Sequence, residues 1–153
     1  MMPELRFYHL QNVDVWHALP GLLGKALQNG RRVLLKTGQV ADWDRHLWTF
    51  NPESFLPHGR EGEPHPDKQP AWIASDETER PNTPDMLLTA GDLWPEDPAA
   101  FDLVCVMFED RDTEAMQTAR SLWKQAKDGD LGDLNLTYWQ QSAAGGWEKK
   151  AGA

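Results

Sequence analysis

Short apolar runs alternate with segments of helical periodicity along the first third of the chain, and this alternation limits the fold more than any other feature of the sequence. Leu5–Leu10 and Arg32–Lys36 have the composition of strands, and Val15–Asn29 and Gln39–Trp48 repeat apolar residues at helical spacing. The order strand, helix, strand, helix is typical of α/β proteins, in which the strands are parallel and buried. The sequence therefore predicts an α/β sandwich.

The rest of the chain continues this architecture after a long interruption. Asn51–Pro70 contains five prolines, which predicts a surface loop around a short extended segment, Phe55–Pro57. Four further strands are expected, at Ala71–Ala74, Met86–Thr89, Phe101–Phe108 and Asn135–Gln140. The third of these is the most apolar stretch and is predicted to be the central strand. A helix capped by Asp110 or Asp112 should run to about Lys127, with a turn over Asp128–Gly132.

We therefore expect one α/β domain over residues 1–147, with a mostly parallel central sheet, and a flexible tail over residues 148–153. Within the first helical segment, Pro20 is expected to start or kink the helix, and Gly30 stands in a good position to end it.

Composition narrows the classes of function. The net charge of −9 argues against broad, sequence-independent binding to DNA or to an anionic membrane. Residues 60–97 hold ten Asp and Glu against three Lys and Arg, a net −7 that leaves only −2 for the rest, so a basic patch can still exist near either end.

No apolar run approaches the roughly 18 residues of a membrane span, and Met1–Asn12 has no signal-peptide pattern, so a cytoplasmic protein is expected. Cys105, the single cysteine, lies in an apolar run and is expected to be a buried, inert thiol.

No pattern for catalysis, cofactor or metal binding emerges from the sequence. Neither GxxxxGK[ST] nor GxGxxG occurs, so no phosphate-binding loop is encoded and the fold is expected to carry no nucleotide. His58, His65 and Asp67 have no standard metal-site spacing and are expected to be solvated loop residues. Ser54 and His58 lack the GxSxG context of a hydrolase nucleophile. We expect no catalytic residue, no metal ligand and no cofactor.

The late helix carries the first candidate binding surface. At 100° per residue, its core stripe consists of Ala115, Ala119, Leu122 and Ala126. A second face, centred about 130° away, consists of Arg120, Trp123, Lys124 and Lys127. Cations near a helix C-terminus are often only a solvated face that complements the helix dipole. The indole beside them instead suits a ligand that is both anionic and apolar, and spacing leaves both interpretations open.

The second candidate surface consists of Trp48, Phe55, Leu56 and Pro57, next to His58. Aromatic residues and prolines at this density, where a helix ends and a loop begins, form either a satellite core under the loop or an exposed protein-binding patch. Spacing does not separate the two.

The residues around this second surface carry a resemblance to a known family. Leu47-Trp48 and the following Pro52-Glu53-Ser54-Phe55-Leu56-Pro57-His58 resemble the LW…PxSF[LV]PH segment of DNA polymerase III chi subunits. Phe7–Leu10 and Gly30–Leu34 are similar to the first two strands of that family. The late helix, through Ala119, Arg120, Trp123 and Lys124, and Leu134–Leu136 are similar to its closing helix and strand. The resemblance runs from about Leu5 to Trp139.

The resemblance implies a Rossmann-like fold without nucleotide chemistry and a place in the clamp-loader assembly of the replicase. It implies that the acidic C-terminal tail of single-stranded-DNA-binding protein, which ends in Phe, contacts Arg120, Trp123, Lys124 and Lys127. It also implies a 1:1 complex with the small psi subunit through Trp48, Phe55, Leu56 and Pro57.

The sequence thus favours a non-catalytic accessory subunit that links DNA polymerase III to single-stranded-DNA-binding protein, touching DNA mainly indirectly and no membrane. One alternative keeps the binding face but makes the chain an adaptor that recruits a repair helicase to the same tail. Another is an enzyme on the α/β sheet, such as a nucleotide hydrolase, against which the missing phosphate-binding loop counts.

Overall fold

A single eight-stranded sheet forms the centre of the molecule, in a computed structural model that describes residues 2–51 and 55–152. The strand order is β3-β4-β2-β5-β6-β1-β7-β8. Every neighbouring pair is parallel except β7 with β8, which is antiparallel. The predicted α/β architecture with a mostly parallel sheet is confirmed.

The strands are β1 (Glu4–Leu10), β2 (Val33–Lys36), β3 (His58–Arg60), β4 (Ala71–Ala74), β5 (Met86–Thr89), β6 (Leu103–Glu109), β7 (Asn135–Gln141) and β8 (Trp147–Gly152). The helices are α1 (Val15–Gln28), α2 (Val40–Thr49) and α3 (Thr113–Lys127), with short 3-10 turns η1 (Pro66–Lys68) and η2 (Pro98–Ala100). No helix in the described part of the chain is long and apolar enough to cross a membrane.

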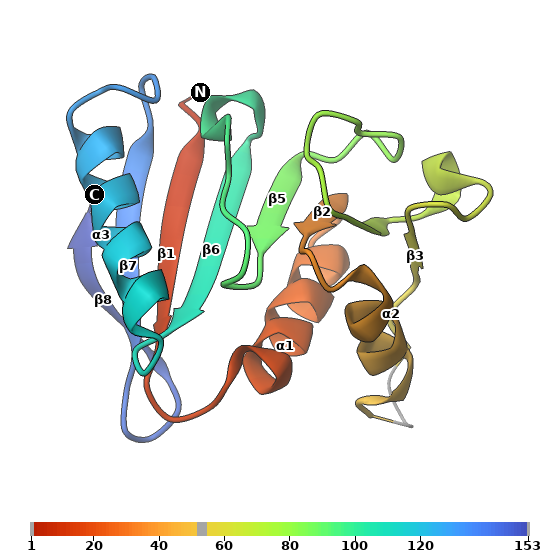
Figure 1. The fold of residues 1–153 in the computed structure, drawn as a ribbon, viewed down its shortest axis with the longest axis horizontal. Coiled ribbons are helices and arrows are strands. Elements are labelled where there is room, and N and C mark those ends of the chain that lie inside the picture. Colours follow the sequence, from red (N-terminus) through yellow and green to blue (C-terminus); the bar gives the residue numbers. More distant parts are fainter. Residues whose placement is uncertain (1, 52–54, 153) are drawn as a thin grey trace.

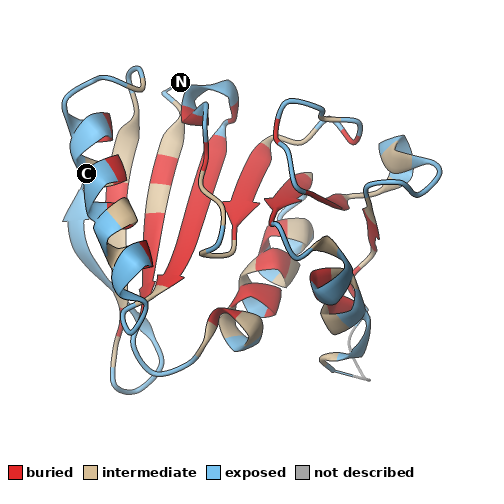
Figure 2. Cartoon of the chain, in the orientation of Figure 1, coloured by how far each residue is buried: buried red, intermediate tan, exposed pale blue. Residues whose placement is uncertain are grey.

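Apolar residues pack on both faces of the sheet, because strands β2, β4, β5 and β6 are buried along nearly their whole length (Figure 2). One core cluster joins α1 and α2 to one face, through residues such as Leu19, Leu23 and Trp43. The other joins α3 to the opposite face, through residues such as Ala119 and Leu122. In Figure 1, α3 runs beside β7 and β1, while α1 and α2 lie toward the other end of the sheet.

The helix ends follow the sequence signals. Asp14 caps α1 by accepting a hydrogen bond from the backbone N–H of His17 at 2.9 Å, and Asp112 caps α3 by accepting from Ala115 at 3.1 Å. Gly30 follows the end of α1 with φ of 82°, a left-handed conformation that glycine adopts without strain. Pro20 neither starts α1 nor ends it, and lies inside the helix with its side chain buried.

Two strands differ from the sequence expectation. The long loop was expected to be extended at Phe55–Pro57, but the paired segment is β3, three residues later, which lies beside β4. At Gly59 a Cβ atom would stand 2.9 Å from Cζ3 of Trp72, so only glycine lets β3 approach β4 this closely.

The expected tail is the second difference. Residues 148–152 belong to β8, which pairs with β7 in the register Gln141 with Trp147 and Trp139 with Lys149. All six residues of β8 are exposed, so its sequence carries no alternation of apolar and polar residues that would have indicated a strand.

Candidate functional site

The basic face of α3 is defined as Arg120, Trp123, Lys124 and Lys127, and its three cations are exposed to solvent. The four residues predicted for the core stripe are all buried: Ala115, Ala119, Leu122 and Ala126. Burial of this stripe leaves Arg120, Lys124 and Lys127 exposed to solvent. The helical periodicity therefore predicted correctly which side chains of α3 lie on the surface.

Trp123 joins the basic face to the core. Its indole is half-buried and lies edge-on to Phe7, with ring centroids 5.3 Å apart, and edge-on to Tyr138 at 5.8 Å. Because its ring packs against β1 and β7, Trp123 offers an apolar wall beside three exposed cationic side chains. The face can thus bind a ligand that pairs carboxylates with an apolar group.

Two residues missed by the sequence analysis lie close to this face. The hydroxyl of Tyr138 is 3.0 Å from Nδ1 of His9, whose side chain is 8% exposed. Burial lowers the pKa of His9, and the positive charge of Arg120 lowers it further, while Asp110 opposes the shift. Burial raises the pKa of Tyr138 and Arg120 acts against it. Both residues are separated from α3 in sequence, so only the fold brings them within the field of Arg120.

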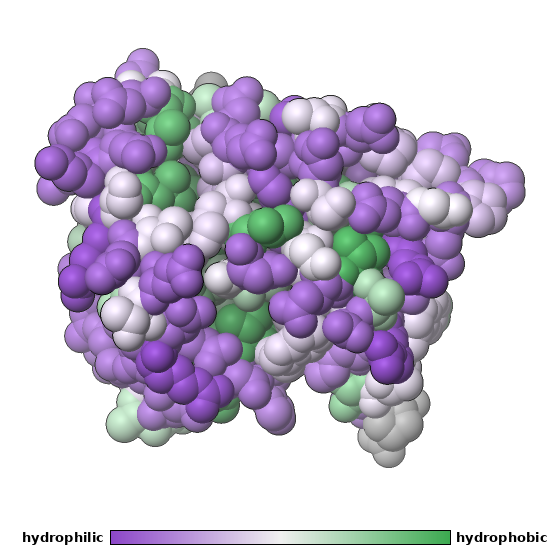
Figure 3. All heavy atoms as spheres, in the orientation of Figure 1, coloured by the Kyte–Doolittle hydropathy of each residue, from purple (hydrophilic) through white to green (hydrophobic). Residues whose placement is uncertain are grey.

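The second surface, the Trp48–Phe55 patch, is defined as Trp48, Phe55, Leu56 and Pro57. Trp48 is 48% exposed and Phe55 is 69% exposed, and their ring centroids are 5.6 Å apart. Two neighbouring aromatic rings in contact with water are characteristic of a binding patch. On the face drawn in Figure 3, the most hydrophobic side chains appear as small separate patches.

Leu56 differs from its neighbours in the patch. It is 7% exposed, packs in the core cluster with α1, and lies close enough to Gly24 that a Cβ there would be 3.4 Å from its Cδ2. Leu56 therefore anchors the segment, while Trp48 and Phe55 are presented to solvent and Pro57 is half-buried. The structure brings the four residues together but makes only part of the set accessible.

His58 has a structural environment rather than the solvated loop position expected from the sequence. It is 4% exposed, with Nδ1 2.6 Å from the carbonyl of Leu56 and Nε2 3.2 Å from a carboxylate oxygen of Asp44. Trp48 lies against it, with ring centroids 4.2 Å apart, and donates from Nε1 to Asp44 at 3.2 Å. His58 and Asp44 therefore fix the orientation of Trp48. Ser54 lies outside the described residues.

A metal or a reactive thiol is not indicated by the geometry. The described residues contain no group of three or more His, Cys, Asp or Glu side chains arranged to hold a metal ion. Cys105 is buried on β6, and burial raises the pKa of its thiol to about 12, so the thiolate is scarce near neutral pH. The predicted burial of this thiol is confirmed.

The chain is similar in sequence to proteins of one known family. Residues 2–132 match the family described as DNA polymerase III chi subunit, HolC. The chain is 33% identical over 90 residues to a probable DNA polymerase III subunit chi of Rickettsia prowazekii (strain Madrid E), an alignment that covers 57% of this chain. It spans 54% of that relative, about half of its length. Both candidate surfaces lie inside the matched residues, and β7 and β8 lie beyond them.

Proposed function

This chain belongs to the DNA polymerase III chi subunit family, and we propose that it links the polymerase to single-stranded-DNA-binding protein as a non-catalytic subunit of the clamp loader. The basic face of α3 binds the acidic C-terminal tail of that protein, and the Trp48–Phe55 patch binds the psi subunit. The cell compartment that follows from this role is the cytoplasm.

The observation that carries the proposal is the combination on α3 of three exposed cations and a half-buried indole, in a chain of net charge −9. A tail that carries carboxylates and a terminal Phe requires both kinds of contact. Arg120 can hold a carboxylate with two N–H groups, Lys124 and Lys127 add positive charge, and Trp123 contacts the Phe ring.

The energetics agree with a reversible contact. Hydrogen bonds to charged groups contribute about 1.5–3 kcal/mol each, and less where water screens them. A few of them, reduced by the cost of ordering a flexible tail, give a binding free energy on the order of −8 kcal/mol, which corresponds to micromolar affinity.

The first prediction tests the basic face. A labelled tail peptide should bind the whole chain, added salt should weaken binding, and removing the last Phe should abolish it. Arg120→Ala and Lys124→Ala should each weaken binding several-fold in fluorescence anisotropy, without changing the melting temperature, because both side chains are exposed.

Lys68→Ala is the matched control, since Lys68 is an exposed cation on η1, beyond the opposite end of the sheet from α3. Wild-type affinity in both α3 variants would place the tail elsewhere. Equal weakening in the control would mean that tail binding depends only on the net charge of the protein.

The second prediction tests the Trp48–Phe55 patch. Phe55→Ala should abolish co-elution with a psi subunit and leave thermal stability nearly unchanged, because the ring is 69% exposed. Leu56→Ala, one residue away but buried, should instead cost about 2–5 kcal/mol of stability. If Phe55→Ala unfolds the protein or still forms the complex, the patch is not the psi site. Capture of a helicase at Phe55 in place of psi would favour the adaptor role.

A further inference from the structure

A cavity of about 500 Å³ lies on the face of the sheet opposite α3 and takes no part in the proposed function. One wall is the length of α1, from Ala18 to Asn29, and the other is the hairpin between β7 and β8. α1 packs over β2 and β6, whereas no described helix lies over β7 and β8 on this side. The cavity occupies the space beside α1 that this arrangement leaves open.

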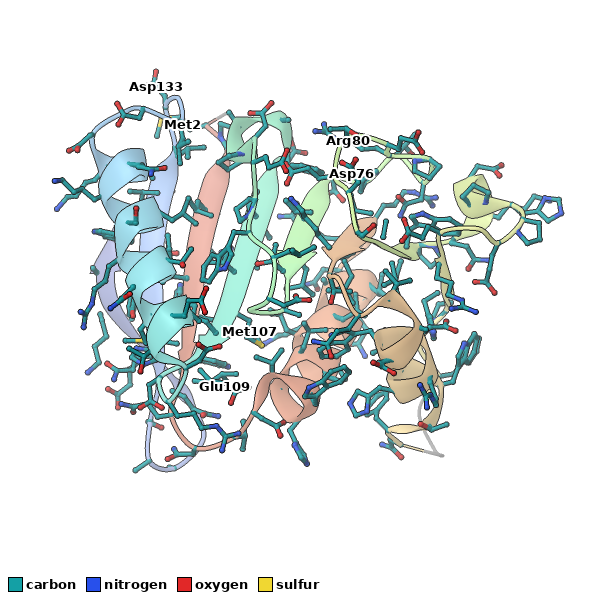
Figure 4. All side chains as sticks on the ribbon, in the orientation of Figure 1. Met2, Asp76, Arg80, Met107, Glu109 and Asp133 are labelled. Atoms are coloured by element: carbon teal, nitrogen blue, oxygen red, sulfur yellow. The ribbon has the colours of Figure 1, made fainter. Side chains whose placement is uncertain are left out.

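The floor of the cavity is apolar. It consists of side chains that also belong to the core below it: Met86, Leu103, Cys105 and Met107. Met107 is labelled in Figure 4, where it lies between the end of β6 and α1. A cavity of this volume with an apolar floor has the dimensions of a small-ligand site, which commonly range from about 300 to 1,000 Å³.

The rim of the cavity is cationic. Arg6, Lys25 and Arg31 line it, and its seventeen lining residues include no Asp or Glu, although the chain has 24 acidic residues. Arg6 is held by Glu4 and by the hydroxyl of Tyr8, and Arg31 by Asp85 at 3.1 Å. Lys25 is exposed and makes no ion pair within the part of the chain that the structure describes. Three cations against two bound carboxylates leave the rim positive.

A buried amide adds directional hydrogen bonding at one end. Gln141 is 6% exposed, and its side-chain oxygen accepts hydrogen bonds from the backbone N–H groups of Gln11 and Asn12, at 3.3 and 3.0 Å. These bonds fix the amide and leave its N–H₂ group without a partner among the described residues, beside the cavity that Gln141 lines. An unpaired donor held in this position is suited to an acceptor on a ligand.

An aromatic ring completes the wall. Trp147, on β8, is 38% exposed and lies edge-on to Tyr8 with ring centroids 5.0 Å apart. Sites for single-stranded nucleic acid combine aromatic rings with nearby cations, because a base stacks on the ring while its phosphate pairs with the cation.

From these observations we propose that the cavity binds one nucleotide unit, with the phosphate at Lys25 and Arg31 and the base against Trp147 and the amide of Gln141. The unit can belong to a free mononucleotide or to a single strand of DNA, since both present the same phosphate and base. The site only binds; it lies along the side of α1 and makes no use of a helix N-terminus.

The test is a titration of the whole chain with a fluorescein-labelled oligo-dT of 12 nucleotides, followed by anisotropy at low salt. The expected dissociation constant lies between about 10⁻⁶ and 10⁻⁴ M. Unlabelled dTMP should displace the strand better than thymidine, which lacks the phosphate. Lys25→Gln should lower the slope of log K against log salt by about 0.7, and Trp147→Ala should weaken binding about fivefold or more.

Lys68→Gln is the control, because Lys68 is an exposed cation on η1 that neither lines the cavity nor belongs to the basic face of α3. The proposal is overturned if neither the strand nor dTMP binds, if thymidine competes as well as dTMP, or if Lys68→Gln changes the salt slope and Lys25→Gln does not. It is also overturned if poly-glutamate displaces the strand as well as dTMP does, since the cavity would then bind anions by their charge alone. Failure of tail binding at Arg120 leaves these outcomes unaffected.

Discussion

His9 shows at the scale of one residue how the fold changes the chemistry of a side chain. It lies on β1 under α3, with Nδ1 beside the hydroxyl of Tyr138 and Nε2 buried without a hydrogen-bond partner among the described residues. Burial lowers its pKa, Arg120 on α3 adds to the shift, and Asp110 after β6 opposes it. The folded protein therefore keeps this imidazole neutral at pH values where the unfolded chain protonates it.

The third prediction follows from the sign of this shift. The unfolded chain binds a proton at His9 near pH 6.5, and the folded protein binds it only at lower pH. The contribution of His9 to stability is thus complete above about pH 6.5 and is lost as the pH falls from that value through the lower pKa of the folded protein. Urea unfolding at pH 7.5 and 5.5 should show a larger loss of stability in the wild type than in His9→Gln, which cannot titrate.

Other groups titrate over the same range, but they are common to both proteins. Their contributions to the pH dependence of stability therefore cancel in the comparison. Parallel losses of stability in the wild type and His9→Gln would show that the imidazole is not held neutral by the fold.

At the scale of elements, a hydrogen bond connects α1 and α2 at a backbone carbonyl of α1 that has no N–H partner within its own helix. Pro20 has no N–H, so the carbonyl of Trp16, four residues earlier, loses its partner within α1. Nε2 of His46, on α2, lies 2.6 Å from that carbonyl and donates to it. Trp16 also stacks on Trp43 of α2, with centroids 4.0 Å apart. The proline is therefore part of the contact between the two helices.

The fourth prediction is a double-mutant cycle at this contact. His46→Ala should destabilise the wild type by about 1–3 kcal/mol, because the part-buried Trp16 carbonyl becomes an acceptor without a donor. In a Pro20→Ala background the cost of His46→Ala should be smaller, since the N–H of the new alanine can bond the same carbonyl. Denaturant unfolding of the four proteins measures the coupling. Additive costs would mean that His46 acts only through its ring contacts.

At the scale of the whole molecule, one buried ion pair connects the sheet to two long connections. Lys36, at the end of β2, is 4% exposed, and its Nζ lies 2.9 Å from both Glu77 and the carbonyl of Trp94. Glu77, which is 1% exposed, also accepts the backbone N–H groups of Glu96 and Asp97. The segments after β4 and after β5 thus meet on one carboxylate. Salt bridges buried to this extent depend on both partners being present.

The fifth prediction removes one partner. Lys36→Met should cost about 3–5 kcal/mol in chemical denaturation, because it leaves a buried carboxylate without its cation. Adding Glu77→Gln should restore part of the loss, since the amide removes the charge and its oxygen still accepts one backbone N–H. Lys68→Met, at an exposed position, should change stability by no more than about 0.5 kcal/mol. A Lys36→Met loss as small as that of Lys68→Met would contradict this account.

The sequence by itself determined the features that depend on residues close together in the chain. The cap of α3, for which Asp112 was one of two candidates, and the buried stripe of that helix follow from residue type and spacing within one element, so they could be predicted. The strands buried on both faces, such as Met86–Thr89, are continuous apolar runs and were equally visible. The exposure of Arg120, Lys124 and Lys127 follows from the same helical period.

The tertiary structure decided what depends on residues far apart. β8 has no buried residue and forms through its pairing with β7, and β3 needs Gly59 against Trp72 of the neighbouring strand. The choice between core and surface at Leu56 and Phe55 depends on α1. The cavity at Lys25 and Trp147 joins residues separated by more than a hundred positions. Local periodicity indicates which face of an element is buried. Contacts between distant segments form only when the packed sheet brings those segments together.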